Sequence, residues 1–173
     1  KPPIDSGEGD STSIDVVFVI DASGSMRSYS RLTTAKEALH TFIGALSESD
    51  RAALIKFNTS ATILSNLTTD KVSVDSLVDS IYAGGDTSMY TGFSEALNML
   101  SKTEETYGYK MIIILSDGSD VPSTSYDSKY APLVQQANDN NIVVYTIGAG
   151  TSVDTSILTK IATNTGGSYY NAT

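Results

Sequence analysis

Three oxygen-bearing side chains follow the first apolar run of the sequence at alternate positions. Asp21, Ser23 and Ser25 come directly after residues 14–20, and Gly24 permits a tight turn between the two serines. If the loop curls around one point, one carboxylate and two hydroxyls converge at the carboxyl end of a buried strand, where open α/β sheets bind ligands. Such oxygen-only ligands suit a hard cation, Mg²⁺ first and then Mn²⁺ or Ca²⁺.

Two later segments offer further oxygen ligands. Asp117 follows the apolar run 111–115, and Thr87 lies in the glycine-rich stretch 84–88. Taken singly, such residues are often helix caps or turn formers, and Ser88 competes with Thr87 as the hydroxyl of its loop. Two carboxylates that point at one spot repel each other unless a cation lies between them. The combination therefore favours a metal site over separate structural roles.

These segments, in this order, resemble the metal-ion-dependent adhesion site of the von Willebrand factor type A (VWA) family. The family pattern is Asp-x-Ser-x-Ser after the first strand, a Thr after a glycine-rich loop, and an Asp, usually followed by Gly, after the fourth strand. The resemblance extends from about residue 14 to residue 171. It implies that the metal ligands are Asp21, Ser23, Ser25, Thr87 and Asp117. It also implies that an acidic residue of a protein partner completes the coordination of the metal.

The elements that position these residues alternate between short apolar runs and longer stretches with helical spacing, which is typical of a mainly parallel sheet covered by helices. We predict strands over 14–20, 52–57, 61–67, 111–115, 142–147 and 168–171, and helices carrying the apolar sets of 32–46, 74–81, 93–100, 133–137 and 157–162. The fold class is therefore α/β, a doubly wound, mainly parallel six-stranded sheet with helices on both faces. The resemblance makes it the Rossmann-like VWA fold.

One edge of this sheet is expected to be antiparallel. Only residues 58–60 separate the runs 52–57 and 61–67, too few for a parallel crossover. We expect 61–67 and 168–171 to be the two edge strands.

The domain organisation predicted is a linker over residues 1–13 and a VWA domain over residues 14–173. The first segment contains Pro, Gly, Ser and acidic residues and almost no apolar residue. The resemblance implies a further amphipathic helix after the last strand, which we do not expect within this chain. Its absence would leave an apolar patch on the sheet or on the first helix.

The composition excludes several classes of function. The chain has no cysteine, which rules out disulfides and thiolate metal sites, and its one histidine, His40, argues against most imidazole-based zinc or triad chemistry. A formal net charge of −9 argues against binding nucleic acid through its phosphates. The longest apolar runs, 16–20 and 111–115, are too short to insert into a membrane as a spanning helix.

Rival sites do not fit the sequence. An EF-hand starting at Asp21 would need glycine where Met26 stands and glutamate where Leu32 stands. A phosphatase with an aspartyl nucleophile usually carries a second Asp where Ser23 stands. No phosphate-binding glycine motif follows a strand.

Three other polar residues are interpreted as structural. Asp86 and Asp120 are taken as solvated loop carboxylates although both neighbour predicted ligands, and His40 as a partly solvated helix residue.

The leading functional hypothesis is a divalent-cation-dependent protein-binding or adhesion module, not an enzyme, in a larger secreted or cell-surface protein. A bacterial origin fits the absence of cysteine. The alternative is an intracellular docking domain of a metal-chelatase-like or other multiprotein assembly. A metal-dependent hydrolase is a third class, disfavoured because no general base stands out beyond the ligands. The partner, its contacts with loops 26–30, 86–91 and 119–128, and the oligomeric state are not specified by the sequence.

Overall fold

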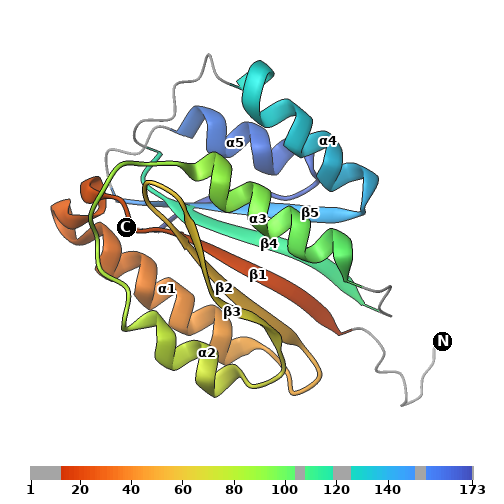
Figure 1. Cartoon of the computed structure of the whole chain (residues 1–173), viewed down its shortest axis with the longest axis horizontal. Coiled ribbons are helices and arrows are strands. Elements are labelled where there is room, and N and C mark those ends of the chain that lie inside the picture. Colours follow the sequence, from red (N-terminus) through yellow and green to blue (C-terminus); the bar gives the residue numbers. More distant parts are fainter. Residues whose placement is uncertain (1–12, 104–107, 119–125, 151–154, 173) are drawn as a thin grey trace.

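A computed structural model describes residues 13–103, 108–118, 126–150 and 155–172 of the chain. The predicted linker lies, apart from Ser13, outside these residues. The described residues form one six-stranded sheet with the strand order β3-β2-β1-β4-β5-β6 (Figure 1). The strands are β1 (Ile14–Asp21), β2 (Arg51–Phe57), β3 (Ala61–Thr68), β4 (Tyr109–Ser116), β5 (Ile142–Ala149) and β6 (Tyr169–Ala172).

Five of these strands are parallel and one edge strand is antiparallel, which confirms the predicted fold class. Strand β1 pairs in parallel with β2 and β4, and β5 continues the parallel order to β6. Strand β3 pairs with β2 in antiparallel fashion, as the short connection predicted. Because β1 lies at the centre, its carboxyl end is flanked by the ends of β2 and β4.

Helices cover both faces of the sheet (Figure 1). They are α1 (Arg31–Ala45), α2 (Lys71–Val78), α3 (Met89–Lys102), α4 (Ala131–Asp139) and α5 (Thr155–Asn164). Alternate side chains of β1 enter two different cores: Val17 and Val19 pack with residues of α3, α4 and α5, whereas Phe18 packs with residues of α1 and α2. Burial on both faces explains why the sequence of β1 reads as a continuous apolar run.

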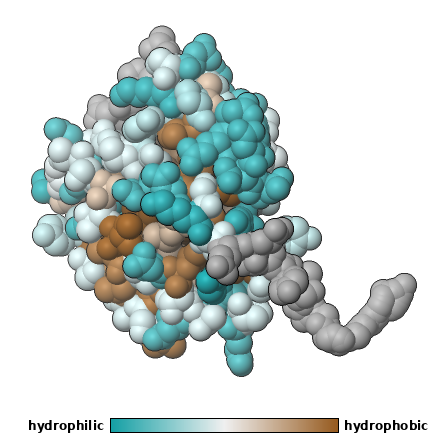
Figure 2. Space-filling model, turned by 45° about the vertical axis from the view of Figure 1, so that its right-hand side comes forward, coloured by the Kyte–Doolittle hydropathy of each residue, from teal (hydrophilic) through white to brown (hydrophobic). Residues whose placement is uncertain are grey.

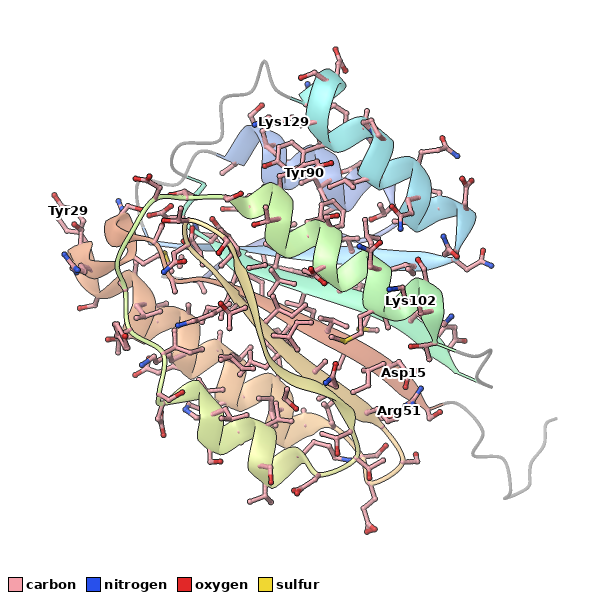
Figure 3. All side chains as sticks on the ribbon, in the orientation of Figure 1. Asp15, Tyr29, Arg51, Tyr90, Lys102 and Lys129 are labelled. Carbon is pink, nitrogen blue, oxygen red and sulfur yellow. The ribbon has the colours of Figure 1, made fainter. Side chains whose placement is uncertain are left out.

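An ion pair joins the neighbouring strands β1 and β2 at the amino edge of the sheet. Asp15 of β1 lies opposite Arg51 of β2, and the guanidinium donates two hydrogen bonds to the carboxylate, of 2.9 Å from Nε and 2.6 Å from Nη2. Figure 3 shows this pair at the far end of the molecule from Tyr29. The same register places Asp21 opposite Phe57 at the carboxyl edge.

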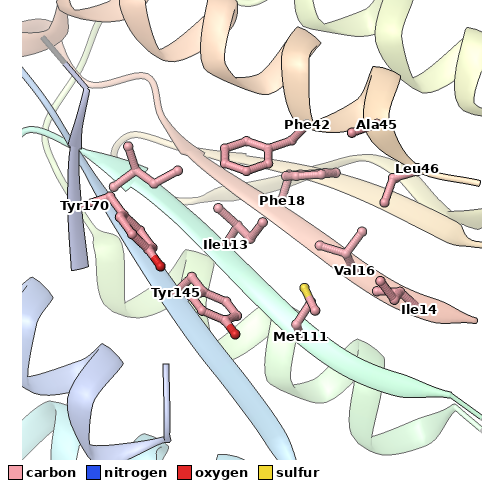
Figure 4. A pocket seen from close by; sticks show the side chains of 11 residues that line it. Ile14, Val16, Phe18, Phe42, Ala45, Leu46, Met111, Ile113, Tyr145 and Tyr170 are labelled. Atoms are coloured by element: carbon pink, nitrogen blue, oxygen red, sulfur yellow. The ribbon is translucent and has the colours of Figure 1, made fainter. Parts of the chain in front are cut away.

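An apolar groove of about 540 Å³ lies on the side of the sheet that α1 covers. Its lining includes Phe18, Phe42, Met111, Tyr145 and Tyr170, which come from β1, α1, β4, β5 and β6 in that order (Figure 4). Figure 2 shows apolar side chains gathered at the lower left of the face in view, with mainly hydrophilic side chains above them. Within the described ranges, no helix is both long enough and apolar enough to cross a membrane.

Candidate metal centre

Two carboxylates lie at the carboxyl edge of the sheet, one after β1 and one after β4. The parallel register pairs Ile20 with Leu115, so that Asp21 and the Ser116-Asp117 step leave neighbouring strands at the same level. Both carboxylate-bearing residues are fully buried. Two acids with no exposed surface need compensating donors or cations around them.

Hydroxyl groups surround the Asp21 carboxylate. Its Oδ1 accepts hydrogen bonds from Ser23 Oγ at 2.6 Å and from the Ser23 backbone N at 2.9 Å, and its Oδ2 accepts one from Ser116 Oγ at 2.7 Å. Ser25 Oγ lies 3.2 Å from Ser23 Oγ. The structure therefore brings Asp21, Ser23 and Ser25 together, in the arrangement that their alternate spacing favours.

The glycine-rich loop before α3 is tied to this group by its backbone. Gly24 N donates to Gly85 O at 2.9 Å, and Gly84 N donates to Ala22 O at 2.8 Å. The contact is close, because a Cβ at position 24 would lie 3.3 Å from Gly85 O, and Gly85 itself has a φ of +82°. Half-buried Thr87 follows two residues later on this loop. The loop thus lies next to the Asp21 segment.

The environment of Asp21 favours the neutral carboxylic acid. Burial raises the pKa of Asp21 to about 6, against the lowering effect of its hydrogen bonds from Ser23 and Ser116, and the charge of Asp117 raises it slightly further. Desolvation, rather than repulsion between the two acids, is the main cause of this raised pKa.

A guanidinium that the sequence analysis did not include lies beside the second carboxylate. Arg31, the first residue of α1, donates from Nη1 to Asp117 Oδ2 at 3.1 Å and to the backbone O of Ser25 at 3.2 Å. Ser116 was also missed as a donor to Asp21. A hydroxyl directly before Asp117 was a usable signal for Ser116, whereas no sequence signal pointed to Arg31.

The donor set is poor in charged ligands. In the part of the chain that the structure describes, no three His, Cys, Asp or Glu side chains are placed to hold a metal ion together. The predicted set has only two carboxylates, and its other members are the hydroxyls of Ser23, Ser25 and Thr87. Neutral oxygen donors with few charges fit Mg²⁺, which tolerates a small number of protein carboxylates.

The remaining polar candidates lie outside this centre. Asp86 is exposed, and Asp120 lies outside the described residues. His40 connects two helices: its Nδ1 lies 2.6 Å from Asp75 Oδ1 and its Nε2 lies 3.0 Å from Asp79 Oδ1. It is partly solvated as predicted, yet both ring nitrogens are engaged.

Comparison with known proteins gives a consistent picture. The family model of the von Willebrand factor type A domain matches residues 15–173. An uncharacterized protein of Borreliella burgdorferi is 30% identical over 159 residues, which cover 87% of this chain and 45% of that protein. The chain spans about half the length of the first curated relatives it matches.

Solved structures share the fold at low sequence identity. An aerotolerance-related membrane protein of Bacteroides fragilis has a TM-score of 0.79 at 18% identity, covering 93% of this chain and 92% of that one. The manganese-loaded TRAP protein of Plasmodium vivax has a TM-score of 0.75 at 21% identity, covering 88% of this chain and 63% of that one. At such identities the likeness shows the fold alone.

Proposed function

The chain belongs to the von Willebrand factor type A domain family, and we propose that it is a protein-binding module that depends on a divalent cation. Domains of this family are commonly interaction or adhesion modules and are generally not enzymes. One observation carries the proposal: two buried carboxylates and at least two hydroxyls gather at the carboxyl edge of β1 and β4. We assign no catalytic role to any of them.

The ligands proposed are Asp21, Ser23, Ser25, Thr87 and Asp117. The hydrogen bonds within the Asp21 segment and the backbone bonds to the Gly84–Gly85 loop support the assignment, because they hold four of the five residues on adjoining segments. Asp117 joins them through the pairing of β1 with β4. Mg²⁺ is the cation we propose, with Mn²⁺ or Ca²⁺ as substitutes. The manganese-loaded state of the TRAP neighbour supports a cation of this kind.

The cation would supply a positive charge that attracts a carboxylate of the partner protein. The serine and threonine hydroxyls bind a cation without neutralising it, so that its charge stays available to an external acid. The Asp21 and Asp117 carboxylates are fully buried, so they would bind the cation from its protein side. We propose no nucleic-acid partner and no insertion into a membrane.

The cellular setting is also part of the proposal. We place the domain in a larger protein of a bacterial cell surface; one structural neighbour of the same fold is a membrane protein of Bacteroides fragilis. Residues 14–173 form the proposed domain and residues 1–13 the proposed linker. The family-model match over residues 15–173 fits these bounds.

Calorimetric titration with MgCl₂ and MnCl₂ tests the metal dependence. We expect the domain to bind one cation, and Asp21→Ala to abolish binding because it removes a buried ligand. Asp86→Ala is the matched control, since Asp86 lies on the same loop as Thr87 but is exposed; it should bind as the parent does. Absence of binding by the parent domain would refute the proposal, and loss of binding in Asp86→Ala would place the ion elsewhere.

A further inference from the structure

Arg31 is a buried cation at the edge of the candidate metal centre. The residue is 8% exposed, and its Nη1 bonds to Asp117 Oδ2 and to the backbone O of Ser25. The Asp117 side chain in this ion pair is fully buried. Solvent screens charges poorly at this depth, so the positive charge of Arg31 acts strongly on neighbouring groups.

The surroundings hold this guanidinium in place. The ring of Tyr29 covers it, with the guanidinium carbon 5.4 Å from the ring centroid. On another side the chain passes close by at Gly150, where a Cβ would lie 3.0 Å from Arg31 Cγ and 3.1 Å from its Nε. Gly150 has a φ of +114°, which together with this contact favours glycine there.

One nitrogen of Arg31 lacks a hydrogen-bond partner. The Nε–H group is buried and donates a hydrogen bond to no acceptor among the residues described. An arginine that served only to stabilise the fold would be expected to satisfy all its buried donors. The guanidinium therefore keeps its ion pair with Asp117 at the cost of one unsatisfied buried donor.

We propose that Arg31 is the internal counter-ion of the metal centre and sets its affinity for cations. This inference rests on the proposed function. The guanidinium neutralises Asp117 and competes with the metal for that carboxylate, and its charge repels the incoming cation. Arg31 therefore weakens cation binding, and its removal tightens it.

The net charge of the centre shows how weaker cation binding can favour binding of an acidic partner. Two carboxylates and one guanidinium carry one net negative charge, and a divalent cation turns this into one net positive charge. Without Arg31, the loaded centre would be neutral and would attract an acidic partner less. Arg31 thus lowers the affinity of the centre for the cation and raises the attraction of the loaded centre for a single external carboxylate.

Two substitutions separate charge from geometry. Arg31→Gln removes the charge and keeps a hydrogen-bond donor, and Arg31→Lys keeps the charge without the planar fork. Titration with MgCl₂ should show binding at least about fivefold tighter in Arg31→Gln, since a like charge is removed a few ångströms away in a poorly screened site. Arg31→Lys should stay within about twofold of the parent, because the repulsion persists.

The outcomes distinguish this inference from the function on which it rests. If the parent domain binds no cation, both fail. If the parent binds but Arg31→Gln binds equally or more weakly, only the counter-ion role fails, because the guanidinium then merely positions Asp117 or has no effect. Thermal melts in EDTA report whether each variant is folded; Arg31→Gln should melt lower than the parent, because it leaves the Asp117 charge buried without its partner.

A measurement on the unmodified chain covers the case in which Arg31→Gln does not fold. The sequence contains only three arginines, Arg27, Arg31 and Arg51, so a spectrum with ¹⁵N-labelled arginine has three guanidinium sets. MgCl₂ should shift the Arg31 signals, because the cation takes Asp117 from it. The Arg51 signals should not move, since Arg51 pairs with Asp15 at the opposite edge. Arg31 signals that stay fixed while the cation binds would overturn the inference.

Discussion

Asp21 is an acid in surroundings that suit its neutral form in the absence of a cation. Its side chain is fully buried, and three donors on Ser23 and Ser116 do not fully offset the loss of hydration. The resulting pKa of about 6 means that the folded protein holds a proton on Asp21 at a pH where the unfolded chain has released it. Stability and cation binding must therefore both depend on pH.

In EDTA, the raised pKa of Asp21 should make the domain less stable as pH rises. Between about pH 4 and pH 6 the folded state binds more protons at Asp21 than the unfolded state does, so this group lowers the free energy of unfolding as pH rises. The raised pKa of Asp21 lowers the free energy of unfolding by up to about 3 kcal/mol at neutral pH. Urea denaturation at pH 4.5 and pH 7 measures it. Asp21→Asn, which cannot titrate, should lack this component; an identical pH dependence in both proteins would contradict the prediction.

Cation binding should show the opposite trend. A metal displaces the proton from Asp21, so affinity should fall as pH decreases through about 6. Calorimetric titration with MgCl₂ at pH 5 and pH 7.5 is the measurement. Unchanged affinity at the two values would show that this carboxylate is not a ligand.

The spacing of the sequence predicts the positions of some residues of this centre but not of others. Asp21, Ser23 and Ser25 could be grouped because the spacing i, i+2, i+4 is local. Arg31 could not, because its position depends on the turn between the motif and α1. Tyr29 and Ser30 both have positive φ, 55° and 58°, and this unusual backbone directs the start of α1 toward Asp117. No spacing rule predicts two such residues in a row.

Helix α3 lies very close to the sheet, and a glycine makes this approach possible. Gly92 is buried, and a Cβ there would lie 2.8 Å from Phe57 Cδ2 and 2.9 Å from Val19 Cγ1. Both neighbours are fully buried core side chains that cannot move aside. Since α3 begins directly after the Thr87 loop, its distance from the sheet also sets the position of that loop.

Gly92→Ala should therefore destabilise the domain by about 1–3 kcal/mol through overpacking, even though alanine favours helices. Gly44→Ala is the matched control, because Gly44 lies at an exposed position of helix α1 with no atom within 4 Å of the added Cβ. It should stabilise by about 0.5–1 kcal/mol. Urea denaturation compares the two; equal effects of the two substitutions would mean that α3 can shift outward without cost.

A histidine holds α1 to α2. The hydrogen bonds that His40 donates to the carboxylates of Asp75 and then Asp79 raise the pKa of His40 above its ordinary value, against weaker desolvation. Lys36, also on α1, donates from Nζ to the backbone O of Asp79 at 3.4 Å. The raised pKa means that the contribution of the His40 pair is fully present below about pH 6.5 and is lost as pH rises through the folded-state pKa.

His40→Gln should accordingly cost stability at pH 6 and much less at pH 9. The difference should not exceed about 1 kcal/mol, since the three side chains are partly exposed. Thermal melts of both proteins at the two pH values give the comparison. A deficit in His40→Gln that is the same at pH 6 and pH 9 would show that the imidazolium charge plays no part.

The strands and helices were largely predictable from the sequence, whereas the contacts between helices were not. Each apolar run became a strand within about two residues of its expected ends, because strands buried on both faces admit few polar residues. The antiparallel hairpin followed from a three-residue connection. The contact of His40 with α2 could not be predicted, since it depends on how α1 and α2 lie together on one face.

The molecule as a whole has two separate cores, one on each face of the sheet, and its inner strands contribute alternate side chains to both. Because Val17 and Phe18 of β1 enter different cores, a change in this strand reaches the helices on both faces. The sequence predicted helices on both faces but not which helix takes which face. Nor did it predict the strand order, because the lengths of the crossovers do not determine which strands become neighbours.

The parallel pairing from β1 to β6 also determines how the domain responds to mechanical force. The chain enters the sheet at Ile14 on the amino edge and completes β6 at Ala172 on the carboxyl edge, beyond strands that all run the same way. Tension applied through these two points runs along the strands and loads their hydrogen bonds in shear, so that many must break together. Tension between Ile14 and Ile142, which both lie on the amino edge, would instead peel the strands apart one bond at a time. Optical-tweezer measurements with handles at these pairs of positions should give the higher unfolding force for the first pair, and a domain that bridges two surfaces would then resist separation most strongly along its own strands.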